Sequence, residues 1–178
     1  MVNTLQSGIL MKKKPSHPDL KSKPLIDCIK QVYGAEQQWV MVLPILQLAV
    51  GSDDLWEVLT KLQKDGKDHL HRLESMFEAL NVEVAQAENK DMEVLIEECY
   101  DIIDVTPRNS FIRDAGLIVG MQQVQQYQIT AYTSLLAQAL ELGEQKVINL
   151  LKIIIHNKQQ EEEQLAMADT GTMLDEIT

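Results

Sequence analysis

The sequence predicts an all-α fold, a bundle of four long helices arranged as two antiparallel hairpins. Three observations lead to this prediction. Glycine and proline are scarce, at 8 and 5 of 178 residues, and aromatic residues make up 4%, whereas β-sheet proteins depend on turn formers and aromatic side chains. Apolar residues recur every three or four positions over four long stretches. Two of the breaks between these stretches are very short, which makes the helices on either side antiparallel neighbours.

The first hairpin is predicted from two consecutive apolar stripes. The first stripe runs from Leu25 to Val50 and the second from Leu55 to Leu80. Gly51, Ser52 and Asp53 end the first helix and supply an N-cap for the second, since a small side chain with an oxygen suits the position before a helix. Pro44 is expected to kink the first helix or loosen one of its turns.

The second hairpin follows after some thirty residues. Residues 81–90 are polar and irregular, and a short helix is expected over 92–103, before a break that contains Pro107. A long helix over 112–142 is ended by Gly143, and a last helix carries apolar residues from Val147 to Leu165. A long connection lets the second hairpin return to the far end of the first, which is the connectivity of ferritin-like four-helix bundles with a short extra helix in the crossover.

These elements predict one domain over residues 23–168. A flexible, lysine-rich N-terminal tail is expected over 1–22, because this segment has turn formers and lysines but no apolar period. A flexible C-terminal tail is expected over 169–178.

Charge and composition exclude several classes of partner. The formal net charge is −11, and the first 24 residues hold five lysines and one aspartate, which leaves the rest of the chain with 11 basic and 26 acidic residues. Such an acidic body repels nucleic acids and anionic lipids. No apolar run approaches the ~18 residues of a membrane span. The two cysteines, Cys28 and Cys99, lack metal-site spacing and predict free thiols in a reducing cytoplasm. We therefore expect neither a nucleic acid nor a membrane partner, and no motif identifies a small-molecule substrate.

Each long helix carries polar residues on its apolar face, near its middle. A carboxylate alone in an apolar core is costly unless it is paired, protonated or bound to a metal. Carboxylate and imidazole groups are candidate metal ligands, whereas the amides are weak ligands and predict a hydrogen-bonded polar layer. The candidate ligands are Glu36, Asp65, His69 and Glu161, and the amides are Gln125, Gln128 and Asn157.

Three interpretations of these residues stay open from the sequence. The first is a hydrogen-bonded layer that fixes the register of the helices. The second is a single, weakly held metal ion. The third is a pair of ions, which ferritin-like centres hold with a Glu from each of two helices and Glu-x-x-His from each of the other two. Asp65 and His69 are four positions apart rather than three, and the amides add no charge, so no resident cofactor is expected, while iron or manganese are the ions that the set would take.

Several strings of residues resemble one known family. The chain is similar to the YciE/YciF-like stress-associated proteins, a ferritin-like family of largely unknown function, over roughly residues 22–168. The strings that carry the resemblance are Tyr33–Gln38, Leu43–Pro44, His69–Glu74, Met92–Glu98, Arg113–Ile118 and Tyr127–Leu136. The resemblance implies a cytoplasmic homodimer of helical bundles, with a carboxylate-rich dimetal centre in the members that keep it.

The chain departs from this family where the family carries its metal ligands. The resemblance implies that Glu36 is retained and that Asp65 stands for a glutamate. It also implies that amides replace the carboxylates of the third long helix, and that His156 and Asn157 replace a pair of glutamates in the fourth. We therefore predict a degenerate dimetal centre in a protein with a non-catalytic or interaction role. The alternative is a metal-dependent oxidase or peroxide-detoxifying protein that uses the retained ligands, so the sequence leaves open whether the protein is an enzyme.

Overall fold

The computed structural model describes residues 21–175, with side chains described as far as Ala168. It confirms the all-α prediction, since no strand occurs in this part of the chain. The helices are α1 (Lys23–Ala49), α2 (Asp53–Ala79), α3 (Lys90–Val105), α4 (Phe111–Leu142) and α5 (Gln145–Asp175).

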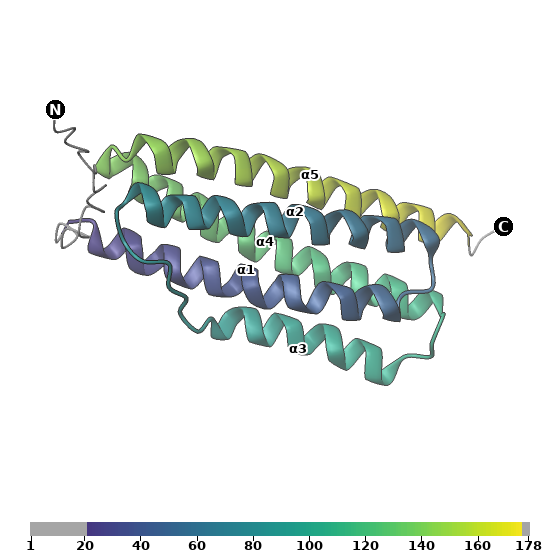
Figure 1. Ribbon diagram of the computed structural model, residues 1–178. Coiled ribbons are helices and arrows are strands. Elements are labelled where there is room, and N and C mark those ends of the chain that lie inside the picture. The colour runs from purple at the N-terminus through teal and green to yellow at the C-terminus, as the bar shows by residue number, and fades with distance from the viewer. Residues whose placement is uncertain (1–20, 176–178) are drawn as a thin grey trace, which may run out of the picture.

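Four of the helices form the bundle and the fifth lies outside it (Figure 1). α1 packs against α2 and α4, and α5 packs against α2 and α4, so these four helices form a closed ring of contacts. α3 packs on the outer side of α1 and α4. The two predicted hairpins and the extra helix in the crossover are therefore all present.

The helices α2, α3 and α4 each begin after a residue whose side chain accepts a hydrogen bond from a backbone N–H of the first turn. Ser52 accepts a hydrogen bond from the backbone N–H of Leu55 at 3.4 Å and caps α2 as predicted. Gly143 ends α4 with φ +70°, a left-handed conformation that glycine adopts without steric cost. α1 continues through Pro44 to Ala49.

The loop between α2 and α3 is held close to α1. The backbone N–H of Ala87 donates to the carbonyl of Lys30 at 3.0 Å. A Cβ atom on Gly34 would lie 2.0 Å from the carbonyl oxygen of Ala87, so only glycine allows this approach. Asn89 caps α3 and exchanges hydrogen bonds with the Tyr127 hydroxyl on α4. The crossover thus has a fixed path over the bundle.

The hydrophobic core consists of two clusters separated along the bundle. One cluster includes Trp39, Leu62, Val124 and Leu165. The other includes Val32, Leu73, Tyr132 and Ile154. In every long helix the polar positions fall between the two clusters, so a polar layer crosses the bundle near its middle.

The two predicted tails differ in how much of each falls within the described residues. Of residues 1–22, only 21 and 22 fall within the described part of the chain. α5 extends to Asp175, so most of the segment 169–178 is helical, and residues 176–178 lie outside the described residues. Its flexibility stays a prediction. No described helix is long and apolar enough to cross a membrane.

Candidate functional site

The polar layer is a cluster of ionisable and amide side chains, which we call the buried centre. Its four ionisable members are 0–1% exposed. α1 contributes Glu36, α2 contributes His69, and α5 contributes Lys158 and Glu161. α4 contributes Gln125, Gln128 and Tyr132, which are 0–2% exposed. All four helices of the bundle therefore contribute to the buried centre.

Glu36 is the most connected member of the buried centre. Its Oε2 accepts hydrogen bonds from Nε2 of Gln128 at 2.9 Å and from the hydroxyl of Tyr132 at 2.8 Å. Its Oε1 lies 3.4 Å from Nδ1 of His69 and 3.2 Å from Nζ of Lys158. An ionised carboxylate only accepts hydrogen bonds, so Nδ1 of His69 carries a hydrogen in this contact. Side chains of three other helices therefore satisfy the buried Glu36 carboxylate, as the first of the three sequence interpretations requires.

Lys158 bridges the two carboxylates. Its Nζ lies 3.2 Å from Oε1 of Glu36 and 3.1 Å from Oε2 of Glu161. Lysines are rarely buried unless they are paired, because the ammonium loses its hydration. The contact joins α1 to α5.

The charges in the buried centre stabilise one another. Burial alone would raise the pKa of Glu36, but Lys158 and the hydrogen bonds from His69 and Tyr132 lower it to about 2. Burial alone would lower the pKa of Lys158, but the carboxylates of Glu161 and Glu36 raise it above its ordinary value. Burial and Glu36 raise the pKa of Tyr132 well above 10, so its hydroxyl stays protonated and donates to the carboxylate. At neutral pH the buried centre is therefore an ion-pair network.

Some polar atoms of the buried centre lack hydrogen bonds. Nε2 of His69 lies 3.9 Å from Oε1 of Glu161, which is too long for a hydrogen bond. Both side-chain polar atoms of Gln125 and Oε1 of Gln128 also have no partner among the described residues. A cavity of about 10 Å³ adjoins Glu36, which is about the space of one water molecule. The buried centre is thus closely packed but not saturated with hydrogen bonds.

A glycine lets α1 and α2 approach at the level of the buried centre. A Cβ atom on Gly66 would lie 2.6 Å from Cγ2 of Val40 and 3.6 Å from Oε1 of Glu36. The absence of that Cβ brings His69, one turn further along α2, into reach of Glu36. Gly66 therefore positions the buried centre although it has no polar side chain.

The structure brings most of the predicted site residues together, but not all of them. Glu36, His69 and Glu161 meet in the buried centre, and Gln125 and Gln128 line it. Asp65 is only half-buried, and no hydrogen bond or ion pair among the described residues joins it to the centre, because Gly66 takes the core-facing position of that turn. The placement of Asn157 on the core face is wrong: it is half-buried, and the next residue, Lys158, faces the core.

Two members of the buried centre, Lys158 and Tyr132, were not among the predicted site residues. A signal for Lys158 exists in the sequence, since the core-facing residues of α5 step regularly by three and four positions through Leu151, Ile154, Lys158, Glu161 and Leu165. Because lysine is usually assigned to the solvent face of a helix, this register is not recognised from the sequence.

As it stands, the buried centre does not fit a metal ion. No group of three or more His, Cys, Asp or Glu side chains that could hold one occurs among the described residues. Glu36, His69 and Glu161 are suitable donors, but the Lys158 ammonium lies between the two carboxylates. We derive no chemistry through a metal from this arrangement.

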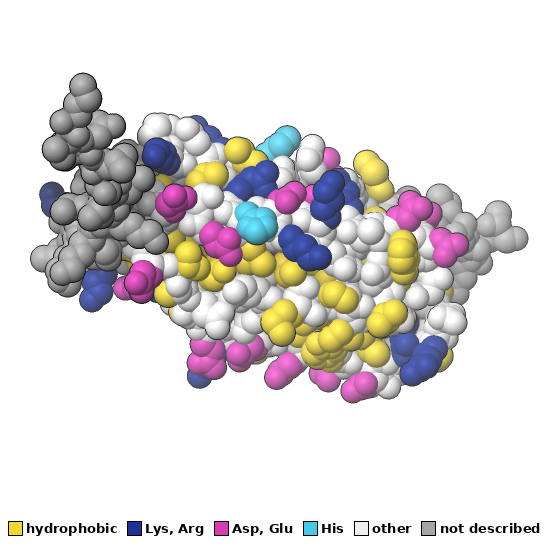
Figure 2. All heavy atoms as spheres, in the orientation of Figure 1, with side chains coloured by type: hydrophobic (Ala, Val, Ile, Leu, Met, Phe, Trp, Pro, Cys, Tyr) yellow, Lys and Arg dark blue, Asp and Glu magenta, His cyan; other side chains and the backbone are white. Residues whose placement is uncertain are grey.

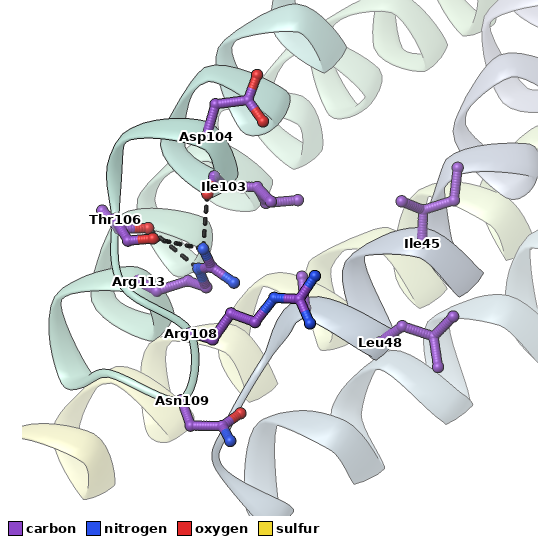
Figure 3. Close-up of a pocket in the computed structure, with 9 residues that line it drawn as sticks. Ile45, Leu48, Ile103, Asp104, Thr106, Arg108, Asn109 and Arg113 are labelled. Carbon is purple, nitrogen blue, oxygen red and sulfur yellow. Dashed lines mark hydrogen bonds between the residues drawn. The ribbon is translucent and has the colours of Figure 1, made fainter.

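A second polar cluster, which we call the terminal clamp, lies at the start of α4. The Arg113 guanidinium donates to the carbonyls of Ile103 and Thr106 and to the Thr106 hydroxyl, all at the end of α3 (Figure 3). The Asp114 carboxylate accepts from the backbone N–H groups of Gly51 and Ser52, at 2.8–3.2 Å. The terminal clamp therefore joins α4 to the end of α3 and to the turn between α1 and α2.

The fold and the buried centre define a ferritin-like helical bundle, and comparison with known proteins supports this class. The chain matches the family model described as a domain of unknown function, DUF892, over residues 21–176. It belongs to this family. It is 30% identical over 128 residues to Protein YciF of Escherichia coli K12, which covers 71% of this chain and 76% of YciF.

Solved structures agree with this assignment. The crystal structure of the E. coli stress protein YciF superposes with a TM-score of 0.81 and 26% identity, over 87% of this chain and 98% of YciF. The structure of YcfI from Rhodopseudomonas palustris superposes with a TM-score of 0.78 and 23% identity, over 84% of this chain and 94% of YcfI. The expected YciE/YciF-like resemblance is confirmed.

Proposed function

We propose that this protein is a stress-associated structural bundle of the YciE/YciF type, in which the buried centre fixes the helices and carries out no reaction. The similarity to a protein named as an E. coli stress protein supports the physiological part of this proposal. The arrangement of charges supports the structural part.

One observation carries the non-catalytic role: the buried centre is closed to solvent. Glu36, His69, Lys158 and Glu161 are at most 1% exposed, and the cavity beside Glu36 measures about 10 Å³. Ligand-binding pockets for small molecules usually measure about 300–1,000 Å³. The described groups that could do acid–base or redox chemistry in the centre are thus engaged with one another, with no room for a substrate beside Glu36.

A homodimer in the cytoplasm is the second part of the proposal. Both cysteines are free, as the reducing cytoplasm requires. Met41, Ile45 and Leu48 form an apolar stripe on α1, with Leu48 88% exposed. Figure 2 shows hydrophobic side chains over α1 and the adjoining α3, beside a row of acidic side chains on the outer edge of α3. Ile45 and Leu48 line a groove of about 700 Å³, into which Arg108 extends (Figure 3). This stripe is the surface that we assign to the dimer.

Sedimentation velocity tests the dimer. We expect a dimer at micromolar concentration and a monomer for Leu48→Asp, because the substitution places a charge in the apolar contact. Leu140→Asp is the matched control, since Leu140 is also exposed but lies on α4. A wild-type monomer, or the same effect from both substitutions, would contradict this surface.

A metal-dependent oxidase or peroxide-consuming protein is the second candidate function. One observation favours it: the facing atoms of His69 and Glu161, 3.9 Å apart, and the Gln125 amide lack hydrogen-bond partners among the described residues. Unsatisfied buried polar atoms are found at ligand sites as well as at ordered waters.

Turnover measurements separate the two functions. Purified protein is mixed with ferrous or manganous ions and hydrogen peroxide, and peroxide loss is compared with a protein-free control and with the Glu36→Gln variant. The structural proposal predicts peroxide loss at the protein-free rate for both proteins. Catalytic turnover that the wild type supports and Glu36→Gln abolishes would establish the enzyme instead.

A further inference from the structure

We infer that the ε-ammonium of Lys158 is the resident cation of the buried centre and that it keeps divalent metal ions out. Glu36, His69 and Glu161 form no metal site while the ammonium lies between the carboxylates, and they become able to bind an ion when it is removed. The inference deepens the proposed structural function and rests on it. Its test is metal uptake, whereas the test of the proposed function is turnover, so the two can fail separately.

The position of Nζ carries the inference. Carboxylates from α1 and α5 approach this one nitrogen at 3.2 and 3.1 Å, and His69 contacts Glu36 at 3.4 Å and faces Glu161 at 3.9 Å. Two carboxylates and an imidazole that converge are an oxygen-rich donor set that suits manganese, iron or cobalt. In this chain the point that the two carboxylates share is already occupied by a positive charge.

Electrostatics explains why the ammonium and a metal ion exclude each other. An ion that bound both carboxylates would lie within a few ångströms of Nζ, and two positive charges repel strongly where the effective dielectric constant is low. Gln125 and Gln128 are neutral and cannot offset a further two positive charges. Lys158 already neutralises one of the two carboxylate charges, so a single net negative charge is left to attract a divalent ion.

Packing prevents Lys158 from making room. Its side chain is 1% exposed and lies in the core register of α5, between Ile154 and Glu161. A metal ion could enter only if the whole lysine side chain left the core, and the carboxylates hold it there. The exclusion is therefore a property of the folded bundle.

Removing the lysine side chain tests the inference. The variant Lys158→Ala keeps Glu36, His69 and Glu161, removes the ammonium and leaves space for an ion with water ligands. Cobalt(II) is a suitable probe, because its visible absorption bands report coordination by protein ligands. We expect Lys158→Ala to take up one equivalent, with an affinity at least on the order of 100-fold higher than the wild type.

Three further variants identify the cause. Lys152→Ala removes an exposed lysine from the same helix and should behave as the wild type. Lys158→Met removes the charge but fills the space, so its uptake should stay well below that of Lys158→Ala. Adding Glu36→Gln to Lys158→Ala should abolish most of the gain, because a charged ligand is lost.

Two results would overturn the inference. The first is stoichiometric uptake of cobalt(II) by the wild type, with absorption bands of a coordinated ion. The second is a folded Lys158→Ala protein that binds no better than the wild type. If Lys158→Ala is unfolded alone, circular dichroism follows its response to cobalt(II): refolding with one equivalent supports the inference, and failure to refold overturns it.

Discussion

The buried centre and the terminal clamp both place charged side chains inside the bundle, but they use those charges differently. Arg113 and Asp114 direct their charges at backbone groups: the carbonyls at the end of α3 and the N–H groups before α2. Glu36, Lys158 and Glu161 direct theirs at one another, across α1 and α5.

This difference decides what each region can do. The ends of every helix leave backbone N–H and C=O groups without hydrogen-bond partners. A charged side chain that binds these groups supplies partners that any helical bundle requires. In the buried centre, by contrast, the charged groups only compensate one another's charge. It contributes specificity of register, since a shift of α5 along α1 would separate Lys158 from Glu36, and its cost is the desolvation of every member.

The largest effect is expected when the cation of the buried centre is removed. Lys158→Met keeps most of the side-chain volume but leaves Glu36 and Glu161 buried without their counter-ion. Breaking one partner of a buried ion pair typically costs about 3–5 kcal/mol. Urea unfolding should show a loss of this size, and Lys152→Met on the exposed face of α5 should change little. A loss below about 1 kcal/mol would show that the pair is dispensable.

Acid should weaken the buried centre through Glu36. The pKa of Glu36 is lowered from 4.5 to about 2 in the folded protein, so the carboxylate contributes stability above pH 4.5 that is lost as pH falls from 4.5 towards 2. The contribution is on the order of 3 kcal/mol. The free energy of unfolding, measured over this range, should fall more steeply for the wild type than for Glu36→Gln. Parallel curves would contradict the assignment.

The terminal clamp should be less costly to break. Asp114→Ala leaves the backbone N–H groups of Gly51 and Ser52 without their acceptor, and hydrogen bonds to charged groups contribute about 1.5–3 kcal/mol. Water can reach the nearby turn and replace part of the loss, so we expect about 2 kcal/mol by urea unfolding. Asp104→Ala removes an exposed carboxylate near the same end of the bundle and serves as the control.

The smallest effect is expected at the close approach of α1 and α2. Gly66→Ala gains about 1 kcal/mol of helix propensity but presses its Cβ against Cγ2 of Val40, and overpacking costs about 1–3 kcal/mol. We therefore expect a net loss of about 1 kcal/mol. The same substitution in a Val40→Ala background should stabilise the protein, because the clash is gone. Thermal unfolding of the four proteins of this cycle measures the change of sign.

Features that depend on neighbours in the chain are predicted from the sequence, whereas the terminal clamp and the buried centre depend on distant residues. Ser52 as a cap, Gly143 as a stop and the two hairpins follow from local rules, because their partners are close in the chain. The terminal clamp needs the tertiary structure, since Asp114 is 63 positions from Gly51.

The register of α5, which decides whether Asn157 or Lys158 faces the core, is harder to predict from the sequence. Asn157 and Lys158 are adjacent, and the apolar residues of this helix are numerous enough to allow either at the core face. Composition favours the amide, because burying a lysine is costly in isolation. The cost disappears only when Glu36, 122 positions away, is placed opposite Lys158. Lys158 is therefore buried because of a residue on another helix, and the sequence of α5 alone does not reveal this partner.

The central claim is that Lys158 is the cation of the buried centre, and anomalous diffraction tests it most directly. Crystals of the wild type grown with manganese chloride are measured at a wavelength where manganese scatters anomalously. We predict Nζ of Lys158 within hydrogen-bonding distance of Glu36 and Glu161 and no anomalous peak between the two carboxylates. An anomalous peak at that point, with the Lys158 side chain displaced from the core, would contradict the account.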